Sequence, residues 1–155
     1  MDSTIHDMLL ACDDAALVVP GNDWSTFPTD ELRQSVLEVH GRLKSDLGLE
    51  LGRDGIPNSG PYFDSLEDRR IVGGNPRHVY SAFAVRFSNF GRLFTVYGDD
   101  AKEFAAMPAD QARQIGEDGG WTFVPAEVLE EPYDGAYLAH RWPEWAWWDR
   151  YFGTA

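Results

Sequence analysis

The fold class is decided by one stretch of the chain, HVYSAFAVRFSNFGRLFTVYG, which covers residues 78–98. From Val79 to Phe87, β-branched and aromatic side chains alternate with a second set of residues, which is the period of a β-strand. Gly91 can supply the positive φ of a three-residue turn, and the segment 92–98 then returns. The stretch therefore predicts an antiparallel β-hairpin.

Helical patterns precede this hairpin. Residues 5–18 carry apolar side chains on one helical face, and Pro20 ends the pattern. A second helix is predicted from Thr29, a plausible N-cap, because leucine and valine then recur every three or four residues. Gly48 is a natural stop for it.

The rest of the chain alternates between irregular and regular segments. Residues 48–76 are rich in glycine and proline and are predicted to be an irregular loop, with a short element possible at YFDSLEDRR. A helix or a pair of short helices is expected over 100–115, broken at Met107-Pro108. A short strand at WTFV and a turn-rich segment, EVLEEPYDG, follow. Segregated helices and an antiparallel sheet predict a single α+β domain spanning residues 1–155.

The C-terminal segment HRWPEWAWWDRYFGTA (residues 140–155) holds four of the six tryptophans. We expect a helix over 143–152 that closes the core, with Pro143 as its first residue and Gly153 after its last. The aromatic rings fall on one face of that helix, and Ala146, Asp149 and Arg150 fall on the other. On this reading, Trp148→Ala costs about 3–5 kcal/mol, and Arg150→Ala changes stability by no more than ~0.5 kcal/mol.

Composition restricts the classes of function. Twenty-six acidic and thirteen basic residues give a net charge of −13, so nucleic acids and anionic membranes should repel the chain and basic proteins should attract it. The single Cys12 excludes an internal disulfide framework and suits a reducing compartment. The N-terminal segment lacks the basic region of a secretory signal, and no apolar run reaches membrane-spanning length. We expect a cytoplasmic, soluble protein.

Charge is also segregated along the chain. Residues 69–98 contain five arginines and no acidic residue, whereas residues 99–134 contain ten acidic residues against Lys102 and Arg113. We expect Arg86 and Arg92 to pair with carboxylates of neighbouring elements. The excess of acidic residues that remains destabilises a monomer by self-repulsion, and its field can speed the capture of a basic partner.

No catalytic or cofactor motif is present. The histidines His6, His40, His78 and His140 stand far apart, without the spacing of a metal site. Cys12 lies among apolar residues of a predicted helix, which is typical of an inert buried cysteine. The sequence therefore predicts no metal, no cofactor and no enzyme activity.

The string PYDG (132–135) followed by WWDRYF (147–152) resembles the C-terminal segments of bacterial immunity proteins, which neutralise polymorphic or contact-delivered toxins. The resemblance is to that class as a whole, whose members are small, acidic, single-domain and cytoplasmic. It implies a tight, one-to-one inhibitor of a toxin domain.

The leading hypothesis is therefore a cytoplasmic immunity protein that binds and blocks a basic toxin enzyme, with a nuclease as the partner that best fits the charge. A nuclease presents a phosphate-binding cleft that a carboxylate-rich surface can occupy. The residues predicted to contact the partner are all acidic and all follow the hairpin: Asp99, Asp100, Glu103, Glu117, Asp118, Glu130, Glu131 and Asp134.

Two alternatives remain open. The chain could be a small enzyme or ligand-binding domain whose pocket is formed by residues 48–76 and the terminal aromatics, and the candidate wall residues are then Tyr62, Trp121, Tyr133 and Trp142. This alternative predicts a concave cavity containing carboxylates of raised pKa. The chain could also be a nucleic-acid mimic, but the basic segment 69–98 interrupts the regular spacing of carboxylates that mimicry requires.

Overall fold

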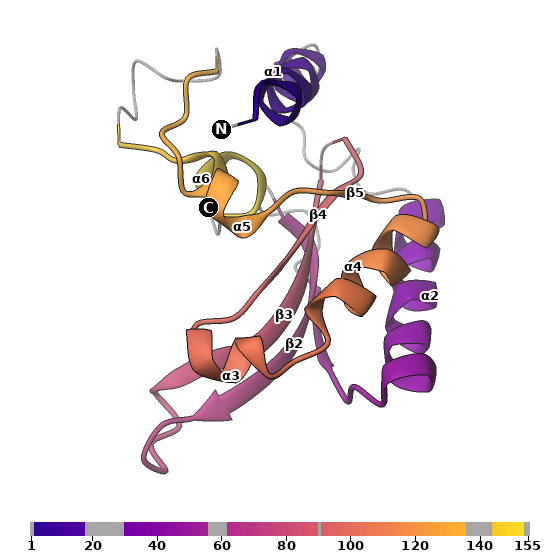
Figure 1. Cartoon of the computed structure of the whole chain (residues 1–155), viewed down its shortest axis with the longest axis vertical. Helices are drawn as coiled ribbons and strands as arrows, with labels where there is room; N and C mark the ends of the chain where they lie inside the picture. Colours follow the sequence, from indigo (N-terminus) through magenta and orange to yellow (C-terminus); the bar gives the residue numbers. More distant parts are fainter. Residues whose placement is uncertain (1, 18–29, 56–61, 90, 136–143, 154–155) are drawn as a thin grey trace.

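A computed structural model of the chain describes residues 2–17, 30–55, 62–89, 91–135 and 144–153. Helices pack against both faces of a five-stranded sheet, which gives the predicted α+β architecture (Figure 1). The helices are α1 (Ser3–Leu17), α2 (Asp30–Leu47), α3 (Ala101–Ala105), α4 (Ala109–Asp118), α5 (Ala126–Leu129) and α6 (Trp147–Tyr151). The strands are β1 (Gly52–Gly55), β2 (Tyr62–Ile71), β3 (Val79–Ser88), β4 (Leu93–Tyr97) and β5 (Thr122–Phe123).

The predicted hairpin, β3 and β4, lies within the sheet, whose order is β1-β2-β3-β4-β5. Gly91 has the expected positive φ of 63° in the turn between the two strands. All neighbouring strands are antiparallel except β4 and β5, which are parallel, so the sheet is mixed. The predicted helices at 5–18, 29–47 and 100–115 are confirmed with small shifts of their ends. Thr29 lies outside the described residues, but the φ of 68° at Gly48 confirms the predicted stop.

The prediction of an irregular loop over 48–76 is wrong, although the possible short element at YFDSLEDRR coincides with β2. This segment contains β1 and the ten-residue strand β2, which is hydrogen-bonded to β1 on one side and β3 on the other. The sequence pattern of β2 does not indicate a strand, because Asp64, Ser65 and Glu67 occupy buried positions where apolar residues are usual. The turn-rich segment after Val124 likewise contains a short helix, α5.

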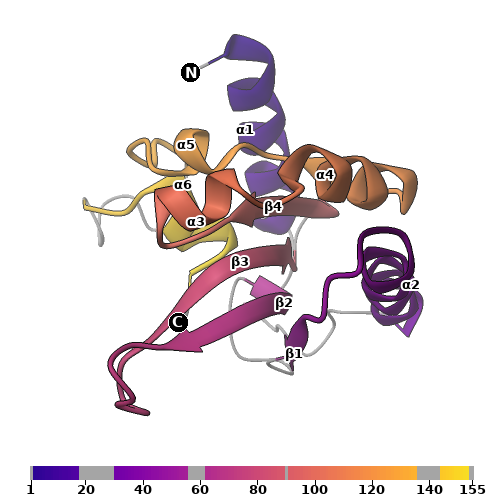
Figure 2. The ribbon, with the colours of Figure 1, turned by 60° about the horizontal axis from the view of Figure 1, so that its bottom comes forward.

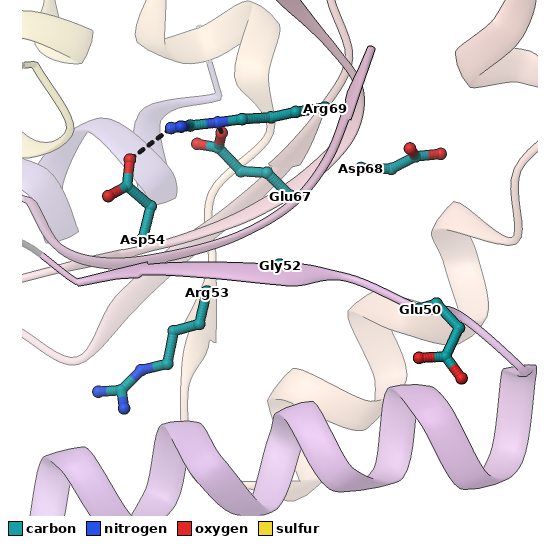
Figure 3. Close-up of a pocket in the computed structure, with 7 residues that line it drawn as sticks. All are labelled: Glu50, Gly52, Arg53, Asp54, Glu67, Asp68 and Arg69. Carbon is teal, nitrogen blue, oxygen red and sulfur yellow. Dashed lines mark hydrogen bonds and ion pairs between the residues drawn. The ribbon is translucent and has the colours of Figure 1, made fainter.

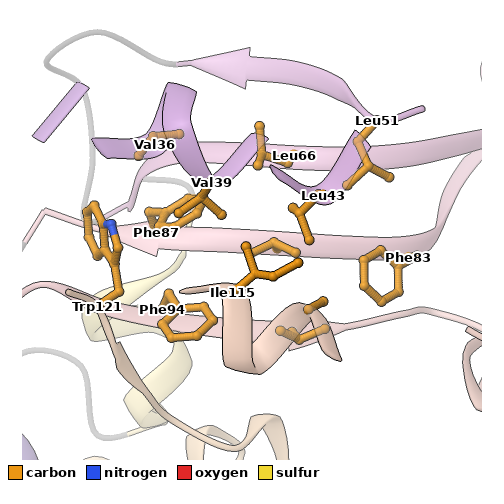
Figure 4. Packing of buried hydrophobic residues seen from close by; sticks show 13 residues of the cluster. Val36, Val39, Leu43, Leu51, Leu66, Phe83, Phe87, Phe94, Ile115 and Trp121 are labelled. Carbon is orange, nitrogen blue, oxygen red and sulfur yellow. The ribbon is translucent and has the colours of Figure 1, made fainter. Parts of the chain in front are cut away.

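The larger core lies between the sheet and the helices α2 and α4 (Figure 4). Its buried members are Val36, Val39, Leu43, Leu51, Leu66, Phe83, Val85, Phe87, Phe94, Val96, Ala112, Ile115 and Trp121. Gly116 allows α4 to approach the sheet closely, because a Cβ atom there would stand 2.3 Å from the ring of Phe94. This core fixes the strands whose opposite face carries the polar cluster described below.

A second core joins α1, α5 and α6 to the start of β4. It contains Leu9, Leu93, Val124, Val128, Leu129, Tyr133, Trp147, Tyr151 and Phe152. The tail therefore packs into the domain, as predicted, and Trp147, Tyr151 and Phe152 are fully buried. Trp148, which was expected to be buried, is only half-buried.

The predicted C-terminal helix begins later than expected, at Trp147. Pro143, its predicted first residue, lies outside the described part of the chain. Before the helix the backbone is extended at Ala146, and its neighbours pair with the segment after α5: the Tyr133 N–H donates to the Trp145 carbonyl over 2.8 Å. The Ala146 N–H instead donates to the Asp149 carboxylate over 2.9 Å. These hydrogen bonds satisfy backbone groups that a longer helix would have used.

The prediction that Arg150 lies on an exposed face is also wrong. Arg150 is 2% exposed, and its Nε donates to the fully buried Asp13 of α1 over 2.5 Å. Tyr133 donates its hydroxyl proton to the other oxygen of Asp13 over 2.6 Å, and Tyr151 donates to the Leu9 carbonyl over 2.6 Å. α6 thus contacts α1 through Arg150 and Tyr151, and it contacts β4 through the rings of Trp148 and Tyr97, so the face opposite its aromatic rings is covered as well.

Candidate functional site

A buried polar cluster lies on the face of β2 and β3 that α2 and α4 leave uncovered. Its centre is Glu67, which is 5% exposed. The Glu67 carboxylate accepts hydrogen bonds from Ser65 at 2.6 Å, from Ser81 at 3.3 Å and from Arg86 at 3.2 Å, and it is also paired with Arg69. The pairing of β2 with β3 thus brings Arg86 to the carboxylate of Glu67, although the two residues are 19 positions apart in the sequence.

The two faces of β2 affect their carboxyl groups in opposite ways. Burial alone would raise the pKa of Glu67, but hydrogen bonds from Ser65, Arg69 and Arg86 outweigh burial and lower it below its ordinary value. On the other face, burial raises the pKa of Asp64 although Arg53 donates to it over 2.6 Å. One cation and one backbone N–H serve Asp64, whereas Glu67 has two cations and two hydroxyls, and this difference explains the opposite signs.

Figure 3 shows both faces where β1 meets β2. Arg53 points from β1 towards α2, whereas Asp54, Glu67 and Arg69 lie on the opposite side of the sheet. These residues, with Glu50, Gly52 and Asp68, line a shallow recess of about 290 Å³. Arg69 pairs with both Asp54 and Glu67, so the recess is closed on that side by an internal ion-pair network.

Replacing Glu67 by glutamine tests the structural role of this network. At pH 7 we expect the variant to lose about 1.5–3 kcal/mol of stability, because hydrogen bonds to a charged group are lost. The folded pKa of Glu67 lies below its ordinary value of 4.5, so its contribution is complete above that value and is lost as the pH falls through the folded pKa. In urea unfolding at neutral and acidic pH, the difference in the free energy of unfolding between the parent protein and the variant should therefore shrink as the pH falls. A constant difference across the pH range would contradict the pKa direction.

A larger cleft lies beside the Glu67 cluster, between the sheet and the C-terminal helix. Its volume is about 670 Å³, within the range of binding pockets. The lining residues combine aromatic rings with charged groups and come from β2, β3, the end of β4 and α6: Glu67, Arg69, Ile71, Val79, Tyr80, Ser81, Arg86, Tyr97, Asp99 and Trp148.

Arg86 lines this cleft and contacts residues on both sides of it. Its guanidinium carbon lies 5.4 Å from the ring centroids of both Tyr97 and Trp148, and its Nη1 donates to the Phe152 carbonyl over 2.9 Å. Arg86 therefore joins the sheet to the tail by cation–π contacts and hydrogen bonds. The predicted pairing of Arg86 and Arg92 with neighbouring carboxylates is confirmed, with Glu67 and Glu31 respectively, but Arg86 is largely covered instead of lying on an outer face.

The predicted partner-binding acids lie in three places. Asp99, Asp100 and Glu103 surround the start of α3, close to the cleft; Glu117 and Asp118 end α4; and Glu130, Glu131 and Asp134 follow α5. Asp99, Asp100, Asp118, Glu130 and Asp134 are exposed, and the other three are partly exposed. The fold thus puts all eight at the surface, in separate groups.

Several of these acids also have structural roles. Asp100 caps α3 by accepting from the Lys102 and Glu103 N–H groups, and Asp99 accepts from the Ser81 N–H over 2.6 Å. Asp118 pairs with Arg42 of α2 over 3.1 Å, and hydrogen bonds from Gln114 and Arg42 lower its pKa. Such exposed pairs are worth little, so these carboxylates can change partners on binding.

The remaining members pair similarly. Glu103 lies 3.3 Å from Arg70 and accepts from Tyr80, Glu117 lies 3.1 Å from Arg113, and Asp134 lies 2.9 Å from His6. Glu130 is exposed and has no partner among the described residues.

The ligand-binding alternative requires its predicted aromatic residues to line one pocket, and the two whose side chains are described do not. Trp121 is 3% exposed and donates to Ser35 within the larger core, and Tyr133 belongs to the second core. Their burial in two different cores contradicts a shared pocket wall. The side chain of Tyr62 and all of Trp142 lie outside what the structure describes. The cleft that exists is lined by a different aromatic set, namely Tyr80, Tyr97 and Trp148.

The groups that could carry metal or nucleophilic chemistry have other roles. Within the described ranges, no three ligand-type side chains approach closely enough to hold a metal ion. His6 contacts Asp134 and the edge of the Trp147 ring, and His40 hydrogen-bonds the Leu51 carbonyl over 2.8 Å. Burial, reinforced by the neighbouring Asp13 carboxylate, raises the pKa of the Cys12 thiol, which disfavours the reactive thiolate.

No family model, curated protein or solved structure matches this chain. None of the helices in the described ranges combines the length and apolar character needed to cross a membrane.

Proposed function

We propose that this protein is a cytoplasmic immunity protein, which binds and neutralises a basic toxin domain, and that the toxin is a nuclease. The observation that carries the proposal is the net charge of −13. Among the acidic residues whose burial is described, only Asp13, Asp64 and Glu67 are buried, and each is paired with arginine. The excess negative charge therefore lies at the surface, where it acts on a partner.

A nuclease fits this surface because its substrate is a polyanion. A cleft that binds phosphates carries lysine and arginine side chains, and a carboxylate-rich protein competes for the same cations. Surface charge of this kind mainly raises the association rate, while a few contacts that lose their water hold the complex together. The internal pairing of the buried ionisable groups is consistent with a binding protein rather than with a catalyst.

The proposal predicts that a basic toxin domain is encoded upstream of this chain's gene, and the absence of such a gene would contradict it. Where the gene is found, the proposal is tested by the kinetics of association with the domain that it encodes. We expect the association rate constant to fall by about tenfold or more between low and high salt, because the attraction is long-ranged and screened. An association rate that does not respond to salt would contradict an electrostatic partner.

Matched charge variants then locate the attractive surface. The double variant D99N/E130Q removes two predicted contact charges, whereas E38Q/D46N removes two charges from the exposed side of α2. Both variants change the net charge equally, so we expect the first to slow association several-fold more than the second. Equal effects would mean that net charge alone matters and would overturn the predicted contact set.

A further inference from the structure

The β2–β3 hairpin extends beyond the rest of the sheet. β1 pairs with β2 only as far as Glu67, and β4 pairs with β3 only from Ala84 onwards. Beyond these points residues 69–71 of β2 pair only with residues 79–81 of β3. We call residues 69–80 the arm, which projects away from the helices in both views (Figures 1 and 2).

The end of the arm is apolar and exposed. Ile71 is 56% exposed, Val72 51% and Val79 49%. They are three of the four large hydrophobic residues that are exposed in the described part of the chain, and the fourth, Leu37, lies on α2. Exposed apolar side chains gathered at one projecting place are typical of a protein-binding surface.

The turn at the end of the arm is ordered by its own hydrogen bonds. The Val72 N–H donates to the His78 carbonyl over 2.8 Å, and the His78 N–H donates to the Asn75 carbonyl over 2.9 Å. Gly73 and Gly74 have positive φ angles of 58° and 73°, which the turn requires. A turn that already has a fixed shape loses little conformational entropy when a partner binds.

The arm contains no acidic residue, and of its arginines only those near its base are paired with carboxylates of the described residues. Near its base Arg69 is paired with Glu67 and Asp54, and Arg70 is paired with Asp68 and Glu103. At its tip Arg77 is exposed and has no carboxylate partner within the described ranges. The tip therefore carries an available cation among apolar residues. The base is flanked by the predicted contact acids at the start of α3, namely Asp99, Asp100 and Glu103.

We propose that the arm inserts into the active-site cleft of the toxin nuclease, an inference that rests on the proposed function. Nucleases commonly hold catalytic metal ions with carboxylates inside a cleft whose rim binds phosphate through cations. Arg77 at the tip meets those carboxylates, and Ile71, Val72 and Val79 pack against the apolar wall of the cleft. The acids at the base of the arm meet the basic rim.

The test uses the full-length protein and the purified toxin domain, with the dissociation constant as the readout. Val72→Ser and Arg77→Ala change exposed side chains, so both variants should melt like the parent protein. We expect each substitution to weaken binding by about thirtyfold or more, as central contact residues do. The matched controls Leu37→Ser and Arg33→Ala, which change an exposed apolar residue and a partly exposed arginine on α2, should weaken binding by less than about threefold.

A double-mutant cycle identifies where the arm binds. If Arg77 reaches a catalytic carboxylate of the toxin, Arg77→Ala should cost much less affinity against a toxin in which that carboxylate is replaced by alanine. An undiminished effect would show that the arm binds elsewhere and would overturn the inference. Parent-like affinity of both arm variants would also overturn it while leaving the proposed function intact. If the parent protein does not bind the toxin at all, both proposals fail.

Discussion

Arg150→Ala is expected to destabilise the domain by about 3–5 kcal/mol, because removal of one partner leaves the other charge buried and unpaired. Arg150 and Asp13 are 2% and 0% exposed, and their pairing connects α6 to α1 across 137 positions of sequence. A typical domain has a total stability of about 5–15 kcal/mol, so this loss would remove a large part of it. Urea unfolding monitored by tryptophan fluorescence measures the change.

Two controls separate the buried pair from a general loss of charge. Arg33→Ala, which removes a partly exposed arginine 3.7 Å from Asp30, should change stability by no more than about 0.5 kcal/mol. The double variant D13L/R150M removes both charges together and should be more stable than Arg150→Ala alone. A shift for Arg150→Ala as small as that for Arg33→Ala would show that the pair is not buried in solution.

Trp147→Ala should cost a similar amount, about 3–5 kcal/mol, because it removes a large, fully buried ring. The Trp147 ring lies 4.8 Å from Tyr133 and 5.9 Å from Tyr151, measured between centroids, so its loss opens a cavity in the centre of the second core. We expect the melting temperature to fall and amide exchange in α1 to accelerate, since α1 is held through Tyr133 and Tyr151.

Trp148→Ala is the matched comparison for this substitution. Trp148 is half-buried at the cleft, where it contacts Tyr97 at 4.9 Å and Phe152 at 5.7 Å, and one side of its ring remains accessible. Its loss should therefore cost clearly less than the loss of Trp147. Equal losses of stability for the two substitutions would mean that Trp147 is not more deeply buried than Trp148, which would contradict the packing of the tail described above.

The strongest local patterns in the sequence predicted most of the fold. Alternation and Gly91 identified the β3–β4 hairpin, and the leucine and valine spacing identified α2, because in both cases an amphipathic period coincides with burial on one side. β2 was anticipated only as a possible short element at YFDSLEDRR and not as a strand, because its buried residues include Asp64 and Glu67, whose charges are balanced by arginines from other positions. A pattern based on hydrophobicity cannot detect a strand whose buried face is stabilised by distant ion pairs.

The candidate site was less predictable for the same reason. The clustering of Glu67, Arg69, Ser81 and Arg86 depends on the β2–β3 register, which no local spacing reports. The Asp13–Arg150 pair spans nearly the whole chain, so helical periodicity alone placed Arg150 on an exposed face. One local signal was available for the arm: Ile71-Val72 stands beside a Gly-Gly turn in the acid-free segment, which favours an exposed hairpin tip with an apolar and basic surface.

The most direct test of the central claim is a titration of nuclease activity. The candidate toxin domain is mixed with increasing amounts of this protein, and cleavage of a nucleic-acid substrate is followed at equilibrium. We expect cleavage to cease at one equivalent of protein per toxin, and a higher salt concentration to shift the curve towards weaker inhibition. Full nuclease activity in the presence of a large excess of the protein would contradict the proposed function.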